Sequence, residues 1–219
     1  MSGFYFMIQV EKIAEKVNKK LQQWSLEQSR LIVAIDGCAG SGKTIIADFI
    51  AKQNKEVIVI HLDDFIKHWQ DRKEMIEKAP DKTVVFRKNW YRYHDLASIL
   101  QLFKNRQSEV AEFYPYDYDK NDFGVVKVLE LNKKILIVEG VFLFQSEAEI
   151  SSYWDKTIYL DVDLSKATDR VIDREKKKWG KDYLPLDHPD NWFKYYKEAY
   201  LQYLKDFQLP EKCDFVLKL

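Results

Sequence analysis

The sequence predicts an α/β fold in which a parallel β-sheet is covered by helices on both faces. Short, unbroken apolar runs alternate with longer segments of helical periodicity along most of the 219 residues. Strands that are buried on both faces of a sheet form such unbroken runs, and their alternation with helices favours parallel pairing. Ligands of these sheets gather at the carboxyl ends of the strands, so the residues after each apolar run are the candidate functional residues.

The first predicted element is an amphipathic helix over residues 8–24, where apolar side chains recur at steps of three and four. Buried strands are expected after it, from Leu31 onward and over residues 57–61, 135–138, 157–162 and 215–217. Further helices are expected from Lys43, over a polar segment that ends at Lys78, and over residues 95–104, 164–178 and 191–207, with Asp95 as an N-cap. A β-hairpin is predicted around the turn-rich residues 119–124, between strand-like residues 109–118 and 125–131.

Composition argues against several classes of protein. The 35 basic and 35 acidic residues cancel, so the chain lacks the basic excess of a nucleic-acid binder. No apolar run approaches the roughly 20 residues that a membrane-spanning helix needs. The two cysteines, Cys38 and Cys213, form no disulfide framework and favour a reducing compartment. We therefore expect a cytoplasmic protein that binds neither nucleic acid nor membrane.

The strongest motif is a glycine-rich loop that follows the first predicted strand, in the sequence LIVAIDGCAGSGKT. It matches the pattern G-x-x-x-x-G-K-S/T, in which backbone N–H groups and the positive end of the next helix hold nucleotide phosphates. Lys43 is expected to reach the β- and γ-phosphates, and the Thr44 hydroxyl to bind Mg²⁺. An ordinary glycine turn is the alternative, but the flanking strand and helix favour the phosphate loop. The predicted nucleotide-binding residues are Gly37, Cys38, Ala39, Gly40, Ser41, Gly42, Lys43 and Thr44.

Acidic residues follow two of the predicted strands. Asp63 and Asp64 come after the run VIVIH, where a carboxylate can face the γ-phosphate, accept a proton from an attacking hydroxyl and lie near Mg²⁺. Helix capping is the alternative for both, and it is the expected role of Asp64. Glu139 comes after the run ILIV, at the position of a metal-side carboxylate. Its alternative is a place in a strand-to-helix turn with Gly140 as the turn residue.

The helix predicted over residues 164–178 is basic. Arg170 and Arg174 lie one turn apart and therefore share a face. Cations over a transferring phosphoryl group stabilise the charge of the transition state, and a basic helix with a flexible end suits a lid. A solvated charged helix is the alternative. We expect Arg170 and Arg174, with Lys43 and Asp63, to form the catalytic set.

Taken together, the segments GCAGSGKT, IHLDDFIK and ILIVEGVFLF, in this order and spacing, resemble the uridine kinase-like family of P-loop kinases. That family includes uridine–cytidine kinases and nicotinamide riboside kinases. The resemblance covers most of residues 31–219 and implies a P-loop NTPase-type sheet, with ATP as the nucleotide and Mg²⁺ as the cofactor. It implies that Asp63 is the general base toward a primary hydroxyl, and that Mg²⁺ lies among Thr44, Asp63 and Glu139. Arg170 and Arg174 match the arginine-bearing lid helix of the family.

The acceptor pocket matches the family pattern less closely. Tyr116 and Asp117 match a Tyr-Asp pair of uridine kinases, but Asn121 stands where those enzymes have a pyrimidine-reading histidine. Aromatic and polar clusters at these positions offer rings that stack on flat ligands and carboxylates that hold a diol. Core and hairpin packing is the alternative for the aromatic residues. The predicted acceptor-binding residues are Tyr93, Asp95, Tyr116 and Asp117.

These features predict an ATP-dependent small-molecule kinase that phosphorylates a hydroxyl of a nucleoside or a related sugar-bearing metabolite. The predicted organisation is one P-loop kinase domain over residues 1–219, with an N-terminal helical extension at 1–28, an acceptor-binding insertion in a small hairpin and helix lobe at 69–131, and a lid at 164–188. A nucleotide-dependent switch or regulatory ATPase or GTPase is the alternative function. It is less favoured because the nearest match to the guanine-reading pattern N-K-x-D, at residues 132–135, lacks the Asp.

Overall fold

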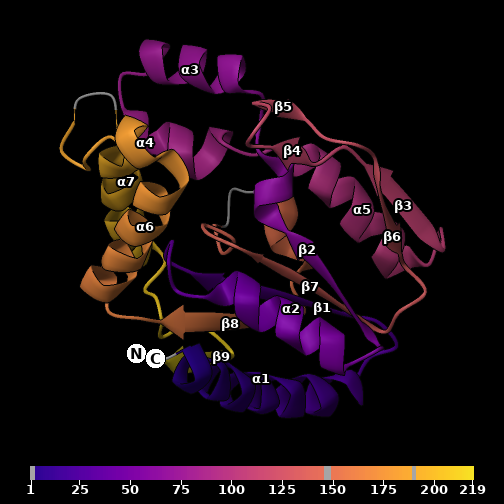
Figure 1. Cartoon of the computed structure of the whole chain (residues 1–219). Helices are drawn as coiled ribbons and strands as arrows, with labels where there is room; N and C mark the ends of the chain where they lie inside the picture. Colours follow the sequence, from indigo (N-terminus) through magenta and orange to yellow (C-terminus); the bar gives the residue numbers. More distant parts are fainter. Residues whose placement is uncertain (1–2, 146–148, 189–190) are drawn as a thin grey trace.

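A five-stranded parallel β-sheet forms the centre of the protein (Figure 1). The computed structural model describes residues 3–145, 149–188 and 191–219, with side chains from residue 9 onward. The strands lie in the order β2-β7-β1-β8-β9, and each neighbouring pair is parallel. Their bounds are β1 Leu31–Gly37, β2 Val57–His61, β7 Ile135–Gly140, β8 Lys156–Asp161 and β9 Phe215–Lys218. Every strand predicted for the parallel sheet is therefore confirmed.

Helices cover both faces of this sheet, as predicted. Alternate side chains of β1 point to opposite faces, so Leu31 and Val33 pack with one pair of helices and Ile32 and Ala34 with another. The first pair is α1 Gly3–Ser25 and α2 Lys43–Gln53, and the second pair is α5 Tyr93–Asn105 and α7 Phe193–Asp206. The α/β fold class that the sequence predicts is confirmed.

The chain between β2 and β7 builds a lobe of short helices and hairpins (Figure 1). Its helical elements are η1 Leu62–Phe65, α3 Trp69–Lys78, α4 Lys82–Val84, η2 Val85–Asn89 and the longer α5. Its strands are β3 Val110–Phe113, β4 Tyr116–Asp117, β5 Asp122–Phe123 and β6 Lys127–Glu130. Strand β3 pairs with β6 and β4 with β5, both antiparallel, so the predicted hairpin is confirmed as two successive ladders.

Two predicted helix caps are wrong, because other residues hold the N-cap positions and each aspartate lies inside a helical turn, paired with a cation. Helix α5 begins at Tyr93 with Arg92 at its N-cap, and Asp95 lies inside the first turn, 2.7 Å from the Arg92 guanidinium. Asp64 lies within η1, and its carboxylate accepts a hydrogen bond of 2.8 Å from Lys127 in β6. The Asp64–Lys127 ion pair therefore joins the lobe hairpin to η1, the element that follows β2.

The chain after β7 forms η3 Glu149–Tyr153, α6 Leu164–Trp179 and η4 Gly180–Asp182 before α7. Helix α6 ends at Trp179, and its C-cap residue Gly180 has φ +55, a conformation that favours glycine. Within the described ranges, none of the helices combines the length and the hydropathy that crossing a membrane requires.

Candidate functional site

Residues 37–44 form a tight loop between β1 and α2. Gly42 is the N-cap residue of α2 and has φ +94, a left-handed conformation that favours glycine. Among the described residues no side chain caps α2, so the N–H groups of its first turn face the loop, as they do in phosphate sites. Lys43 lies at the start of the helix, and its ammonium group donates across the loop to the Cys38 carbonyl oxygen at 3.2 Å. This is the local geometry of an anion cradle.

The loop packs against two later helices. Gly40 has φ +81, and a Cβ added there would lie 2.2 Å from the carbonyl oxygen of Ala167 in α6. From the same helix, the Arg170 guanidinium donates to the Gly40 carbonyl oxygen at 3.1 Å. From α7, the Tyr196 hydroxyl accepts the Ala39 N–H at 2.6 Å. The position of the loop is therefore set by helices that lie more than a hundred residues away in sequence.

Asp36, the last residue before the loop glycine, is fully buried at the end of β1. Its carboxylate accepts hydrogen bonds from the Gly37 N–H at 2.5 Å, the Leu143 N–H at 2.7 Å and the Tyr203 hydroxyl at 2.6 Å. Burial raises the pKa of Asp36 to about 6, although these donors and Lys43 act in the opposite direction. Asp36 thus joins the phosphate loop, the turn after β7 and helix α7.

Glu139 lies beside Thr44 at the carboxyl edge of the sheet. It is an internal residue of β7, so the alternative of a strand-to-helix turn is wrong. The Thr44 hydroxyl donates to Glu139 Oε1 at 3.0 Å, and His61 Nδ1 lies 2.8 Å from the same oxygen. Burial opposes ionisation of Glu139, but the His61 hydrogen bond and the Lys43 charge outweigh it and lower the pKa of this carboxyl group.

Asp63 lies in η1, directly after β2, and is open to solvent. The Tyr91 hydroxyl donates to Asp63 Oδ1 at 3.3 Å. The protein around Asp63 and the charge of Glu139 raise the pKa of the Asp63 carboxyl group above its ordinary value, against the effects of Lys43, Tyr91 and Arg174. A carboxylate with a raised pKa and an accessible oxygen is suited to accept a proton.

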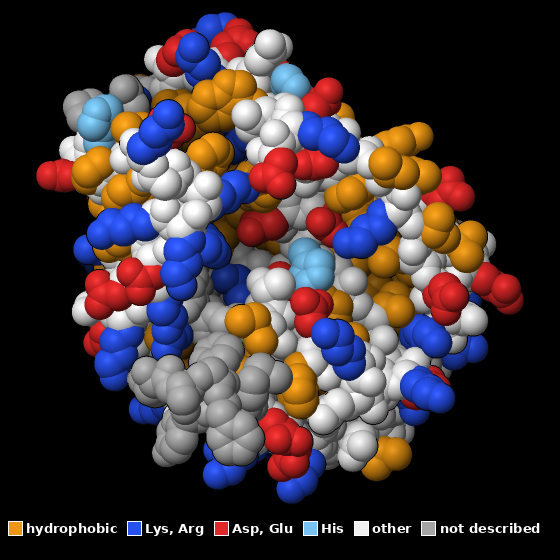
Figure 2. Space-filling model, viewed as in Figure 1, with side chains coloured by type: hydrophobic (Ala, Val, Ile, Leu, Met, Phe, Trp, Pro, Cys, Tyr) orange, Lys and Arg blue, Asp and Glu red, His pale blue; other side chains and the backbone are white. Residues whose placement is uncertain are grey.

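Basic side chains of α6 face this acidic edge across a hollow. In Figure 2 Lys and Arg side chains gather on one wall of the hollow, and acidic side chains and a histidine lie on the other. Arg174 is exposed, pairs with Glu175 at 3.2 Å and is close enough to Asp63 to lower its pKa. At the end of α6, Lys178 pairs with Asp119 of the lobe hairpin at 3.0 Å. The predicted lid helix therefore contacts the loop at one end and the lobe at the other.

The four predicted acceptor-binding residues do not form one cluster of mutual contacts. Tyr116 is buried, its hydroxyl accepts from Arg72 at 2.6 Å and donates to Asn121 at 3.1 Å, and Asp117 pairs with Lys120 at 3.2 Å. Both lie on β4, which packs against the η1 element that carries Asp63. Tyr93 is buried and donates to the Arg87 carbonyl oxygen at 3.3 Å, whereas Asp95 pairs with Arg92 on α5. The acceptor roles of all four residues stay predictions.

Sequence reasoning missed several residues that complete the site. Tyr91 donates to Asp63, Tyr196 holds the loop, and His61 and Asp36 bond to Glu139 and to Gly37. His61 and Asp36 carried a signal, because each is a polar residue at the end of an apolar run. Neither tyrosine carried a local signal for its partner, because Tyr91 lies between η2 and α5, 28 positions from Asp63, and Tyr196 lies in α7, 157 positions from Ala39.

The oxygen ligands at this edge fit Mg²⁺ that is bound together with nucleotide phosphates. Across the described ranges, no group of three or more His, Cys, Asp and Glu residues could hold a metal by itself. Mg²⁺, however, is usually bound through one or two carboxylates and the substrate phosphates, with water in the other positions. The Thr44 hydroxyl and the Glu139 carboxylate, 3.0 Å apart beside the phosphate loop, are hard oxygen donors of this kind.

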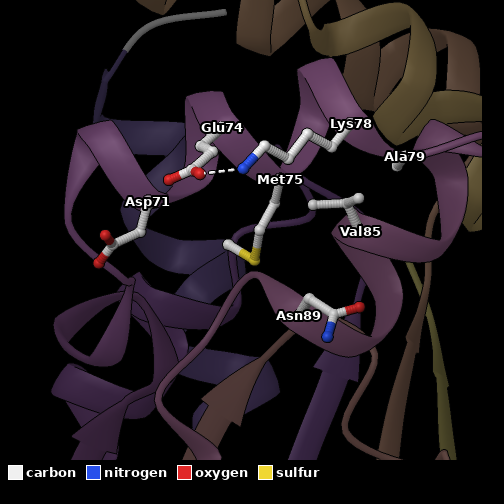
Figure 3. Close-up of a pocket in the computed structure, with 7 residues that line it drawn as sticks. All are labelled: Asp71, Glu74, Met75, Lys78, Ala79, Val85 and Asn89. Carbon is white, nitrogen blue, oxygen red and sulfur yellow. Dashed lines mark hydrogen bonds and ion pairs between the residues drawn. The ribbon is translucent and has the colours of Figure 1, made fainter.

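A second hollow lies on the lobe, between α3 and η2 (Figure 3). Within it Lys78 and Glu74 form an ion pair along α3, and Met75 and Val85 supply apolar surface. The residues that line it are Asp71, Glu74, Met75, Lys78, Ala79, Val85 and Asn89. None of them belongs to the phosphate loop or to the acidic edge, so this hollow is separate from the candidate site.

Comparison with known proteins agrees with the geometry. A family model described as Phosphoribulokinase / Uridine kinase family matches residues 32–210. A uridine kinase of Borrelia duttonii is 28% identical over 151 residues, which cover 68% of this chain and 69% of the relative. Uridine kinase-like protein 3 of Arabidopsis thaliana is 23% identical over 213 residues. That match covers 96% of this chain, but the chain spans only 43% of the length of that relative.

Among solved structures, D-glycerate 3-kinase of Cryptococcus neoformans superposes with a TM-score of 0.66 at 16% identity. The match covers 96% of this chain and 95% of the neighbour, which shows a shared fold. The family model covers most of the chain and includes the loop, the acidic edge and α6. The chain therefore belongs to the phosphoribulokinase/uridine kinase family.

Proposed function

We propose that the protein is an ATP-dependent kinase that transfers the γ-phosphoryl group to a hydroxyl of a small molecule, a nucleoside or a related sugar-bearing metabolite. One observation carries this proposal: the phosphate loop, Asp63, Thr44 and Glu139 meet at one edge of the sheet, beneath a basic helix. Phosphoryl transfer requires placement, charge neutralisation and an oriented nucleophile more than covalent chemistry from the protein.

The residues divide these tasks. The loop N–H groups and Lys43 would hold the β- and γ-phosphates, and Arg170 and Arg174 would face the charge that develops during transfer. Mg²⁺, held by Thr44 and Glu139 with Asp63 nearby, would neutralise phosphate charge. Asp63 would orient the acceptor hydroxyl and accept its proton, for which its raised pKa and open position are suited.

The acceptor is expected to lie between Asp63 and the lobe. Tyr116 and Asp117 lie on β4, which packs against η1, and are the better placed of the predicted acceptor residues. Tyr93 and Asp95 lie on α5 and are bonded to Arg87 and Arg92 instead. Relatives in the family include uridine kinases, and a structural neighbour is a D-glycerate 3-kinase. The names of both relatives describe phosphoryl transfer to an acceptor smaller than a protein, which supports a small-molecule acceptor here.

The test is a phosphotransfer screen with uridine, cytidine, nicotinamide riboside, pantothenate, D-glycerate and simple sugars. We expect ATP consumption to rise with one acceptor class and Asp63→Asn to lower kcat by about 10²- to 10⁴-fold, the usual range for loss of a general base. The matched control is Asp64→Asn, because the Asp64 carboxylate is next in sequence to Asp63 but is paired with Lys127. ATP hydrolysis that is independent of every acceptor would instead favour a switch or regulatory NTPase.

A further inference from the structure

His61 is held by a carboxylate at each of its two ring nitrogens. Nδ1 lies 2.8 Å from Glu139 Oε1, and Nε2 lies 3.3 Å from Asp48 Oδ1. The histidine and Glu139 side chains are mostly buried, at 23% and 5% exposure, whereas Asp48 is half exposed. No role in the proposed reaction described above uses either His61 or Asp48.

The fold brings these side chains together from three elements. His61 and Glu139 are register partners in the parallel strands β2 and β7, so their side chains lie next to each other on one face. Thr44 and Asp48 are four residues apart on α2, and residues at this spacing share a face of a helix. The result is a continuous chain of polar contacts, Asp48 to His61 to Glu139 to Thr44.

Both contacts to Glu139 fall on the same oxygen. Oε1 accepts from the Thr44 hydroxyl and from His61, whereas Oε2 has no hydrogen-bond partner among the described residues. Oε2 is also not one of the buried polar atoms that lack a partner, so it is accessible from the cleft. A carboxylate with one oxygen fully engaged and the other unengaged is therefore oriented for a further ligand.

We propose that His61 is a positioning residue that, held in place by Asp48, engages Glu139 Oε1 and leaves Oε2 for the Mg²⁺ that accompanies the nucleotide. This inference rests on the proposed function and adds the residues that orient its metal-side carboxylate. Groups that hydrogen-bond to a metal ligand fix its orientation, and their loss typically weakens metal affinity by about 10- to 100-fold. Imidazole suits the task because its two nitrogens point in different directions and reach both carboxylates.

The test measures nucleotide binding rather than turnover. Dissociation constants for ATP are determined by titration calorimetry, once with Mg²⁺ and once with EDTA, on the full chain and its variants. For His61→Leu we expect ATP binding with Mg²⁺ to weaken by about 10- to 100-fold, and binding in EDTA to stay at the wild-type value. His61→Asn should recover much of the loss, since its amide can still donate to Glu139 Oε1, and Asp48→Ala should show a smaller, metal-dependent loss.

The matched control is His94→Leu, because His94 also contacts a glutamate, Glu149 at 3.2 Å, but is 83% exposed and lies on α5, outside the phosphate loop and the acidic edge. A loss of equal size with and without Mg²⁺, or no loss in His61→Leu and Asp48→Ala, would overturn the inference. Melting curves without ligand show whether each variant is folded. If His61→Leu does not fold, Asp48→Ala decides, because Asp48 is half exposed. If the wild-type protein binds no ATP in either buffer, the proposed function itself is overturned. That outcome differs from a failure of the His61 role alone, in which the wild type still binds ATP.

Discussion

The hydrogen bonds of Tyr203 should make a measurable, pH-dependent contribution to stability. Its hydroxyl donates to Asp36 Oδ2 at 2.6 Å and accepts the Phe144 N–H at 3.0 Å. Tyr203→Phe removes both contacts and keeps the ring. A hydrogen bond to a charged group contributes about 1.5–3 kcal/mol, and an orphaned buried donor costs about 1–3 kcal/mol. Because the two are not fully additive, we expect the free energy of unfolding to fall by about 3 kcal/mol.

The pH dependence follows from the carboxyl group of Asp36, whose pKa is about 6 in the folded protein, above its ordinary value of 3.8. The Tyr203 hydroxyl stabilises the ionised form, so its removal raises the folded-state pKa of Asp36 further. Above both folded-state pKa values the variant lacks the charge-assisted bond and its deficit is largest. As the pH falls through those pKa values, Asp36 is protonated in both proteins and the deficit shrinks.

The assay is urea unfolding of wild type and Tyr203→Phe at pH 8 and pH 5. At pH 8 the melting temperature should also drop by about 6–12 °C, from the usual 2–4 °C per kcal/mol for a chain of this size. Tyr200→Phe is the control, because among the described residues its hydroxyl is hydrogen-bonded to the neutral Tyr159 hydroxyl, at 2.7 Å, and its effect should not change between these pH values. A Tyr203→Phe deficit that is equal at pH 5 and pH 8 would refute the coupling to Asp36.

Two further predictions concern the loop and the base. Gly40→Ala should abolish ATP binding in calorimetry and lower the melting temperature, because the new Cβ would lie 2.2 Å from the Ala167 carbonyl oxygen at a φ of +81. The control Gly124→Ala, whose Cβ would lie 3.3 Å from the nearest atom, should bind ATP normally. The apparent pKa of the acid limb in a kcat/KM–pH profile should lie above the ordinary pKa of an Asp carboxyl group, since activity is lost as the pH falls through the raised pKa of Asp63. An unchanged acid limb in the residual activity of Asp63→Asn would assign that limb to another group.

Patterns of residues close in sequence were enough to predict most of the fold. Continuous apolar runs of β-branched residues predicted each strand of the parallel sheet, and the glycine pattern located the loop and the start of α2 at Lys43. The hairpin was predictable because a turn-rich stretch separated two strand-like segments. Such features depend on residues that are close in sequence, where steric and periodic rules act directly.

The predictions that failed are the two helix caps, at Asp64 and Asp95. Asp64 and Asp95 have the side chains that favour helix N-caps, but each is paired with a cation, Lys127 or Arg92. Helix α5 begins two residues before Asp95, directly after the bridge that Tyr91 forms with Ile66, so its start depends on a contact that is distant in sequence. Asp64 pairs with Lys127, which is 63 positions away, and no local pattern could indicate that partner.

Sequence alone determined that this chain builds a phosphate loop on a parallel sheet, because backbone conformation and strand burial follow from short-range residue patterns. Only the tertiary structure decided how that loop is held and how its acidic edge is oriented. Tyr196 reaches Ala39 across 157 positions, and Tyr203 reaches Asp36 across 167. Such contacts exist only after the helices pack on the sheet, since their geometry comes from the crossing of whole elements and not from any local pattern.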